Sequence, residues 1–220
     1  SSVPMRFSLN GLRLVLDCAN GAAYATAPHV FEELGAEVIT VGREPDGLNI
    51  NLEVGSTYPE KLAKLVSEYR ADLGVALDGD GDRCIMVDGE GAVVDGDLLL
   101  YIIATSRQQS GELHGPIVGT LMTNLGLEHA FQKKSIPFMR AAVGDRYVLE
   151  LLQQHDGTIG GESSGHLLCL DRTSTGDGIV SALQVLYEVV ESGKTLAELT
   201  AEVQRYPQKM INVRLRDCKV

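Results

Sequence analysis

The sequence predicts an α/β protein made of two consecutive, similar α/β domains, each with a mixed, mainly parallel sheet flanked by helices. Two observations indicate this class. Extended apolar segments alternate with helical patterns along nearly the whole chain, which is typical of strand–helix–strand units. The alternation stops at a polar stretch at residues 108–112 and then begins again. We therefore expect a boundary there, with one domain at residues 1–111 and the other at residues 112–220.

The first half alternates strands and helices and ends with a hairpin and a helix. A glycine at position 35 follows the first helical pattern, at the place where a left-handed residue commonly ends a helix. A Gly-Glu-Gly sequence at residues 89–91 joins two short strands as a hairpin. We expect strands at residues 12–17, 37–41, 72–77, 85–88 and 92–95, and helices at residues 22–34, 59–69 and 97–109.

The second half repeats the alternation. Its sequence Gly193-Lys194-Thr195 is similar to the end of a phosphate-binding P-loop, but no strand precedes it, so we interpret Gly193 as the end of a helix. We expect strands at residues 116–121, 138–143, 158–159, 167–170 and 210–215, and helices at residues 125–134, 146–154, 177–191 and 196–204.

The composition argues against several classes of partner. Thirty acidic residues against 19 basic residues give a formal net charge of −11. This balance argues against a nucleic-acid or anionic-membrane partner, because each would need a basic surface. No apolar run approaches the ~20 residues of a membrane-spanning helix. The four cysteines lie far apart without a Cys-x-x-Cys pair, which argues against a zinc site or disulfides and favours a cytoplasmic protein.

The most informative segment is an Asp-Gly-Asp-Gly-Asp-Arg sequence at residues 78–83, directly after an apolar strand. Alternate side chains of an extended strand point to one side, but their spacing of ~6.5 Å is too wide for three oxygens that each lie about 2.1 Å from one Mg²⁺. The two glycines permit the backbone to curl. Because three convergent carboxylates would repel one another without a cation, we expect Asp78, Asp80 and Asp82 to bind Mg²⁺ or Mn²⁺.

Three alternatives to a magnesium site exist for this acidic loop. A calcium loop of the EF-hand kind would need Gly at its sixth position and Glu at its twelfth, where this chain has Arg83 and Gly89. A solvated acidic turn is the simplest alternative, although three aspartates in strict alternation with glycine are not typical of turns. A metal-dependent phosphatase with an aspartyl nucleophile in the loop is the third.

A second polar loop has the sequence Gly-Gly-Glu-Ser-Ser-Gly-His at residues 160–166. Glu162 and Ser164 can form hydrogen bonds with a polyhydroxylated ligand, and His166 can transfer a proton near neutral pH. The loop also matches the Gly-x-Ser-x-Gly elbow of hydrolases, but that motif requires a helix after the serine, and a strand pattern follows here. A polar turn with a structural histidine is the remaining alternative.

A strand turns into a helix at Gly144-Asp145-Arg146-Tyr147. A basic residue in the first helical turn is opposed by the helix dipole. Arg146 is therefore either a ligand for an anion or an exposed surface residue.

The acidic loop and the Gly-Glu-x-Ser-Gly-His segment together resemble the metal loop and the sugar-recognition loop of the α-D-phosphohexomutases. Residues 17–22, 143–148 and 175–178 are most similar to the bacterial branch of that family that acts on glucosamine phosphates. The resemblance covers only the second and third of the family's four domains. The chain contains no Ser-His dipeptide and no Ser-Gly-Thr segment, so the family's active serine and main phosphate clamp would lie outside these 220 residues.

The resemblance implies the central part of an enzyme that interconverts glucosamine 6-phosphate and glucosamine 1-phosphate through a phosphoserine. The three aspartates of the acidic loop would hold Mg²⁺ near that phosphoserine. Arg83 would orient the reacting phosphate, and His166 would assist proton transfer. The residues assigned to binding of the hexose phosphate are Gly144, Asp145, Arg146, Glu162 and Ser164.

Two other functions stay open at this point. The same family contains phosphomannomutases and phosphoglucomutases, which would use the same loops on another hexose. The second open function is a non-catalytic module that binds a metal and a sugar phosphate. It stays open because these 220 residues alone, without the phosphoryl-carrying serine, would be inactive. The expected partners are the hexose phosphate and the flanking domains of the same enzyme, and the oligomeric state is left open.

Overall fold

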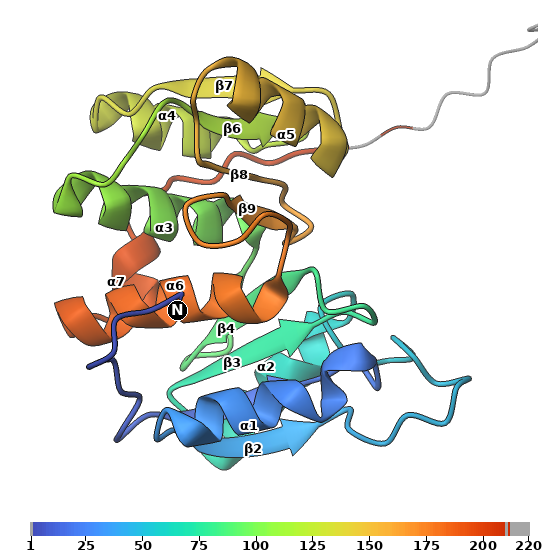
Figure 1. The fold of residues 1–220 in the computed structure, drawn as a ribbon. Helices are drawn as coiled ribbons and strands as arrows, with labels where there is room; N and C mark the ends of the chain where they lie inside the picture. The colour runs from blue at the N-terminus through green and yellow to red at the C-terminus, as the bar shows by residue number, and fades with distance from the viewer. Residues whose placement is uncertain (1, 210, 212–220) are drawn as a thin grey trace, which may run out of the picture.

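The structure is a computed structural model that describes residues 2–209 and 211. It contains two β-sheets with a layer of helices between them (Figure 1). The first sheet has the strand order β2-β1-β3-β4-β5. Strand β1 is parallel to β2 and β3, whereas β4 is antiparallel to β3 and to β5. The strands are β1 (Arg13–Asp17), β2 (Glu37–Val41), β3 (Leu73–Leu77), β4 (Cys84–Asp88) and β5 (Val93–Val94).

The second sheet is smaller and has the strand order β7-β6-β8-β9. Strand β6 is parallel to β7 and β8, and β9 returns antiparallel to β8. In each sheet the first strand of the unit therefore lies between the next two, so a topological switch point occurs between β1 and β3 and again between β6 and β8. The strands are β6 (Ile117–Thr120), β7 (Phe138–Ala141), β8 (Ile159–Gly161) and β9 (Leu167–Cys169).

Helices connect the strands, and side chains cap several of them. The carboxylates of Asp95 and Asp177 accept backbone N–H groups at the starts of α3 and α6, and both helices end at a glycine in the left-handed conformation, Gly111 and Gly193. The helical elements are η1 (Ala22–Tyr24, a 3₁₀ turn), α1 (Thr26–Glu33), α2 (Pro59–Tyr69), α3 (Gly96–Ser110), α4 (Leu125–Lys133), α5 (Asp145–Gln154), α6 (Gly178–Ser192) and α7 (Leu196–Thr200).

Alternating side chains place apolar residues on both faces of the sheets. In β1, Leu14 and Leu16 face the core that α1 and α6 cover, whereas Val15 faces α2 on the other side. In the second sheet, Ile117 faces α3 and α4, and Val118 packs with α5. Each sheet therefore has helices on both faces, as a mainly parallel sheet requires.

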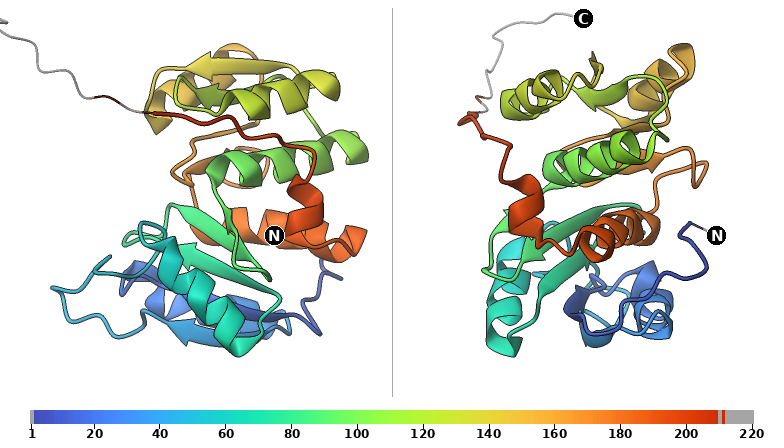
Figure 2. Two further views of the ribbon diagram at one scale, coloured as in Figure 1. Left: turned by 180° about the vertical axis from the view of Figure 1, so that it is seen from behind. Right: turned by 90° about the vertical axis from the view of Figure 1, so that its left-hand side faces the viewer.

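Helices α3 and α6 form the layer shared by the two sheets (Figure 2). Helix α3 contacts α6, β4 of the first sheet and β8 of the second. Buried side chains from α3, from α6 and from both sheets form one continuous apolar cluster. The two halves consequently share a core and lie firmly against each other.

The predicted fold class is confirmed, because two α/β units with mixed sheets follow one another along the chain. The boundary at residues 111 and 112 stays a prediction; it assigns α3 to the first unit although this helix packs on both sheets. No helix among the described residues is both long enough and apolar enough to cross a membrane.

Several predicted elements were wrong in extent. Instead of one helix at residues 22–34, a 3₁₀ turn precedes α1. The helix predicted at residues 196–204 ends at Thr200. The chain beyond it contacts the start of α4, where the N–H of Tyr206 donates to Asn124 Oδ1 at 3.0 Å. The strand predicted at residues 138–143 ends at Ala141. The one predicted at residues 210–215 lies outside the described residues, apart from residue 211.

A buried carboxylate lies at the start of α3. Asp97 is 3% exposed, and its Oδ2 accepts the N–H of Asn124 at 2.8 Å. Its Oδ1 has no hydrogen-bond partner among the described residues. Burial raises the pKa of Asp97 to about 6, although the N–H of Asn124 opposes this effect.

We expect Asp97→Asn to flatten the pH dependence of stability. Because folding raises the pKa of Asp97 from 3.8 to about 6, the folded chain binds this proton more tightly than the unfolded chain. That stabilisation is complete below about pH 4 and is lost as the pH rises through about 6. The melting temperature of the variant, relative to the unmodified chain, should therefore rise between about pH 4.5 and about pH 7.5. Glu60→Gln on the exposed surface of α2 is the control; an equal pH trend in both variants would contradict the expectation.

Candidate metal centre

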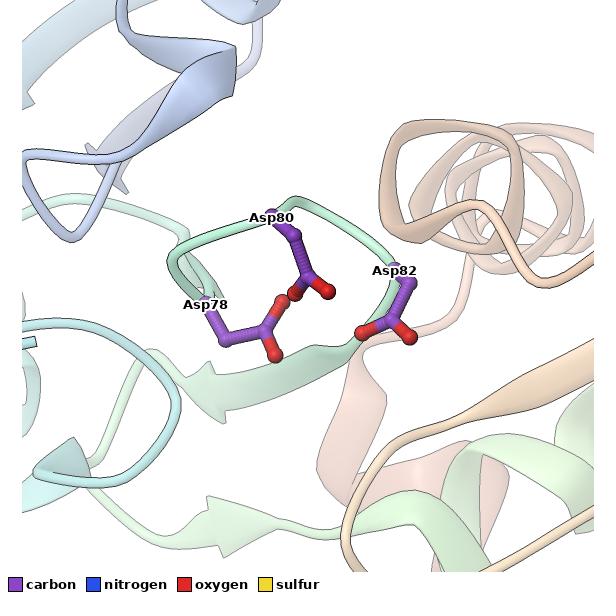
Figure 3. Close-up of side chains that lie close together, drawn as sticks. All are labelled: Asp78, Asp80 and Asp82. Carbon is purple, nitrogen blue, oxygen red and sulfur yellow. The ribbon is translucent and has the colours of Figure 1, made fainter. Parts of the chain in front are cut away.

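The acidic loop connects β3 to β4 at the carboxyl end of β3, next to the switch point of the first sheet. It curls as predicted, since Gly81 has a φ of 78°. The carboxylates of Asp78, Asp80 and Asp82 point toward one another (Figure 3), and one oxygen from each lies within 4.8 Å of the others. The structure therefore brings together all three predicted metal ligands.

The electrostatics of this cluster favour a cation. Burial is the largest cause that raises the pKa of Asp78, to about 6, and the charges of Asp82 and Asp80 add to it, whereas the N–H of Arg83 lowers it. Among the described residues, Asp82 Oδ1 is buried without a hydrogen-bond partner. Arg83 Nε lies 3.6 Å from Asp78 Oδ2 and 3.9 Å from Asp82 Oδ1, so one cation already faces the cluster. An orphaned oxygen within an all-carboxylate donor set fits a hard divalent ion such as Mg²⁺ or Mn²⁺.

Two segments of the first half of the chain hold the acidic loop in place. The carbonyl of Gly79 accepts the N–H of Ala22 at 2.8 Å, and Gly21 leaves no room for a side chain there, because a Cβ would lie 2.3 Å from the Gly79 carbonyl oxygen. On the other side, Ile50 and Asn51 pack so closely on Gly79 that a Cβ there would lie under 3 Å from both side chains. The loop is thus held between η1 and the long connection from β2 to α2.

Asp17 fixes these supporting segments. This carboxylate ends β1, is fully buried, and accepts the N–H of Ala19 at 2.9 Å and the N–H of Gly55 at 2.8 Å. Ala19 has a φ of 57°, a conformation that needs outside support in a non-glycine residue. Asp17 is not among the predicted site residues, although an acidic residue at the carboxyl end of a buried strand is a usable signal.

The second polar loop connects β8 to β9 and lies at the switch point of the second sheet. Glu162 Oε1 accepts the N–H of Gly144 at 2.7 Å, and the hydroxyl of Ser164 donates to Glu162 Oε2 at 3.5 Å. Gly144 lies just after β7, so the Glu162 side chain spans the end of the intervening strand β6. A strand, β9, follows the loop, which removes the basis for a hydrolase elbow.

Backbone hydrogen bonds join the two loops directly. Arg83 and His166 form an antiparallel bridge, and the N–H of Cys84 donates to the carbonyl of Gly165 at 3.0 Å. At the side-chain level, His166 Nδ1 lies 3.1 Å from Asp82 Oδ2. The two loops, whose contacting residues Asp82 and His166 are 84 positions apart in the sequence, therefore form one site.

The residues at the start of α5 lie at different distances from this site. Asp145 Oδ2 is 3.9 Å from His166 Nε2, which places Asp145 at its edge. The Arg146 side chain is 81% exposed, and its Nε donates to Glu150 Oε1 on the same helix at 2.8 Å. The structure thus shows no contact between Arg146 and the metal cluster, and its anion-binding role stays a prediction.

The family models that match the chain carry the description phosphoglucomutase/phosphomannomutase. The alpha/beta/alpha domain II model matches residues 4–91, and the domain III model matches residues 95–206. The chain belongs to this family. Its matched parts are thus the second and third domains of a phosphoglucomutase/phosphomannomutase protein.

Similar proteins support the same assignment. The phosphoglucosamine mutase of Methylobacillus flagellatus is 60% identical over 215 residues, which are 98% of this chain and 48% of that protein. The one of Alkalilimnicola ehrlichii is 61% identical over 212 residues, 96% of this chain and 47% of that protein. This member of the family therefore spans about half the length of these curated relatives.

Solved structures of other proteins have the same fold. A phosphoglucomutase/phosphomannomutase family protein from Burkholderia thailandensis superposes with a TM-score of 0.78 at 25% identity, over 88% of this chain and 43% of that chain. The N-acetylphosphoglucosamine mutase of Aspergillus fumigatus, solved with GlcNAc-6P and magnesium, gives a TM-score of 0.75 at 20% identity, over 92% of this chain and 48% of that chain.

We expect Asp17→Ala to destabilise the chain by about 2 to 4 kcal/mol, because two buried N–H groups lose their acceptor. Asp46→Ala is a matched control, since Asp46 Oδ1 also accepts two backbone N–H groups but is exposed to solvent that can replace it. The control should lose less than about 1 kcal/mol. Urea denaturation measures both values, and equal losses would show that Asp17 does not organise the loops.

Proposed function

We propose that this chain is the metal-binding and sugar-recognition part of a phosphoglucosamine mutase, which interconverts glucosamine 6-phosphate and glucosamine 1-phosphate. The observation that carries the proposal is the convergence of the three aspartates beside the second polar loop. Identities near 60% to proteins with that name, over nearly all of this chain, support it. The phosphoryl-carrying serine would lie in the part of the enzyme outside these 220 residues.

The acidic loop is proposed to hold Mg²⁺. Asp78, Asp80 and Asp82 would each supply a carboxylate oxygen, and the bound ion would supply positive charge that stabilises the phosphoryl group in transfer. Magnesium in the solved fungal protein of the same fold supports this choice of ion. The Arg83 side chain is 44% exposed, so its guanidinium can contact both the aspartates and a phosphate in solvent.

The second polar loop is proposed to bind the sugar. Glu162 Oε1 is held by the N–H of Gly144, whereas Oε2 accepts only the long 3.5 Å bond from the Ser164 hydroxyl, so both Oε2 and that hydroxyl can also bond to hydroxyl groups of a hexose. Asp145 lies at the edge of the same site. Because the two loops are joined by backbone hydrogen bonds, a hexose held by Glu162 and Ser164 would lie close to the metal.

We expect Asp80→Asn in the full-length enzyme to lower kcat by at least about 100-fold, since one anionic ligand of the metal is lost. Activity measured against Mg²⁺ concentration checks this, and excess Mg²⁺ should not restore turnover. Glu191→Gln, exposed at the end of α6, is the control for loss of one negative charge. Unchanged Mg²⁺-dependent turnover in Asp80→Asn would show that the acidic loop is not the metal site.

We expect Glu162→Gln to lower kcat/KM for glucosamine 6-phosphate by about 100-fold while the melting temperature changes by no more than a few degrees. The amide oxygen of Gln can still accept the N–H of Gly144, so the loop should stay folded. Normal turnover in this variant would contradict the role of Glu162 in sugar recognition. Comparing kcat/KM for glucosamine, glucose and mannose phosphates separates the proposed enzyme from the other mutases of the family.

A further inference from the structure

Residues 175–178, Thr-Gly-Asp-Gly, pack against both the acidic loop and His166. The N–H of Gly178 donates to the carbonyl of Gly81 at 2.8 Å, and a Cβ on Gly178 would lie 2.5 Å from the Arg83 carbonyl oxygen. A Cβ on Gly176 would lie 2.5 Å from Cε1 and Nε2 of the His166 ring. Both glycines therefore permit a close approach that any side chain would prevent.

The His166 ring is in turn fixed against one oxygen of Asp82. Residue 166 is 8% exposed, and its Nδ1 lies 3.1 Å from Asp82 Oδ2. Because a carboxylate only accepts hydrogen bonds, Nδ1 carries the proton and donates it in this contact. A side chain from the second half thus holds a metal ligand of the first half.

The other oxygen of Asp82 faces the metal cluster. Arg83 Nε lies close to both Asp82 Oδ1 and Asp78 Oδ2, so these two oxygens are on the same side. Figure 3 shows one Asp82 oxygen directed toward Asp78 and the other directed away from it. Oδ1 is also the oxygen without a hydrogen-bond partner among the described residues.

We propose that Gly176 and His166 are positioning residues for the metal site: Gly176 packs on the imidazole, and the imidazole holds Asp82 so that Oδ1 faces the ion. This inference rests on the proposed metal-binding role of the acidic loop. A carboxylate whose second oxygen is already hydrogen-bonded loses little rotational freedom when it binds a metal, and partners of this kind commonly contribute 10-fold to 100-fold in metal affinity. The second half of the chain thereby sets the metal affinity of the first.

The test is the affinity for Mn²⁺ alone, measured by electron paramagnetic resonance on the full-length protein without substrate. His166→Ala and Gly176→Ala should each weaken Mn²⁺ binding by about 10-fold. His166→Asn, which keeps a donor near the position of Nδ1, should stay within about 3-fold of the unmodified protein. The double variant, with both His166→Ala and Gly176→Ala, should bind Mn²⁺ about as weakly as His166→Ala alone. In it the methyl group added at position 176 no longer contacts an imidazole ring.

Two controls distinguish the possible failures. His29→Ala removes an exposed histidine on α1 and should not change the affinity, whereas Asp80→Asn should abolish binding. If Asp80→Asn abolishes binding but His166→Ala and Gly176→Ala bind normally, the positioning role is overturned and the metal site stands. If the losses of Mn²⁺ affinity in the two single variants multiply in the double variant, the positioning role is also overturned. If the unmodified protein binds no Mn²⁺, or Asp80→Asn binds it normally, the metal site and the positioning role both fail.

Discussion

Three carboxylates repel one another in the acidic loop, and the surrounding segments must hold them together. Asp78, Asp80 and Asp82 place oxygens within 4.8 Å of one another, and burial of Asp78 makes this arrangement more costly. A chain with only local preferences would turn these side chains outward to solvent. The surrounding structure opposes that tendency, because the backbone of Gly79 is held by η1 and the backbone of Gly81 is held by the start of α6.

The position of the acidic loop explains why the two halves share a core. The loop belongs to the first sheet, but its later residues pair with the second polar loop and with the N-terminus of α6. Such pairing requires the carboxyl edges of both sheets to meet at one place. Helices α3 and α6, which are buried between the sheets, provide the apolar contact that keeps those edges together.

Much of the fold and the composition of the site could be predicted from the sequence because their signals are local. The strand at residues 37–41 and the helix at residues 59–69 have the predicted bounds, and the alternation of aspartate with glycine was enough to predict convergent carboxylates. What could not be predicted depends on contacts between distant parts of the chain. Asp17 binds the N–H of Gly55, 38 residues away, and Asp82 contacts His166, 84 residues away. No periodicity in the sequence encodes such pairs.

Anomalous diffraction from crystals of the protein grown with Mn²⁺ would locate the metal ion directly. We expect an anomalous peak between Asp78, Asp80 and Asp82, about 2.1 Å from one oxygen of each, with His166 still in contact with the other oxygen of Asp82. No peak at saturating Mn²⁺, or a peak only at another place on the molecule, would contradict it.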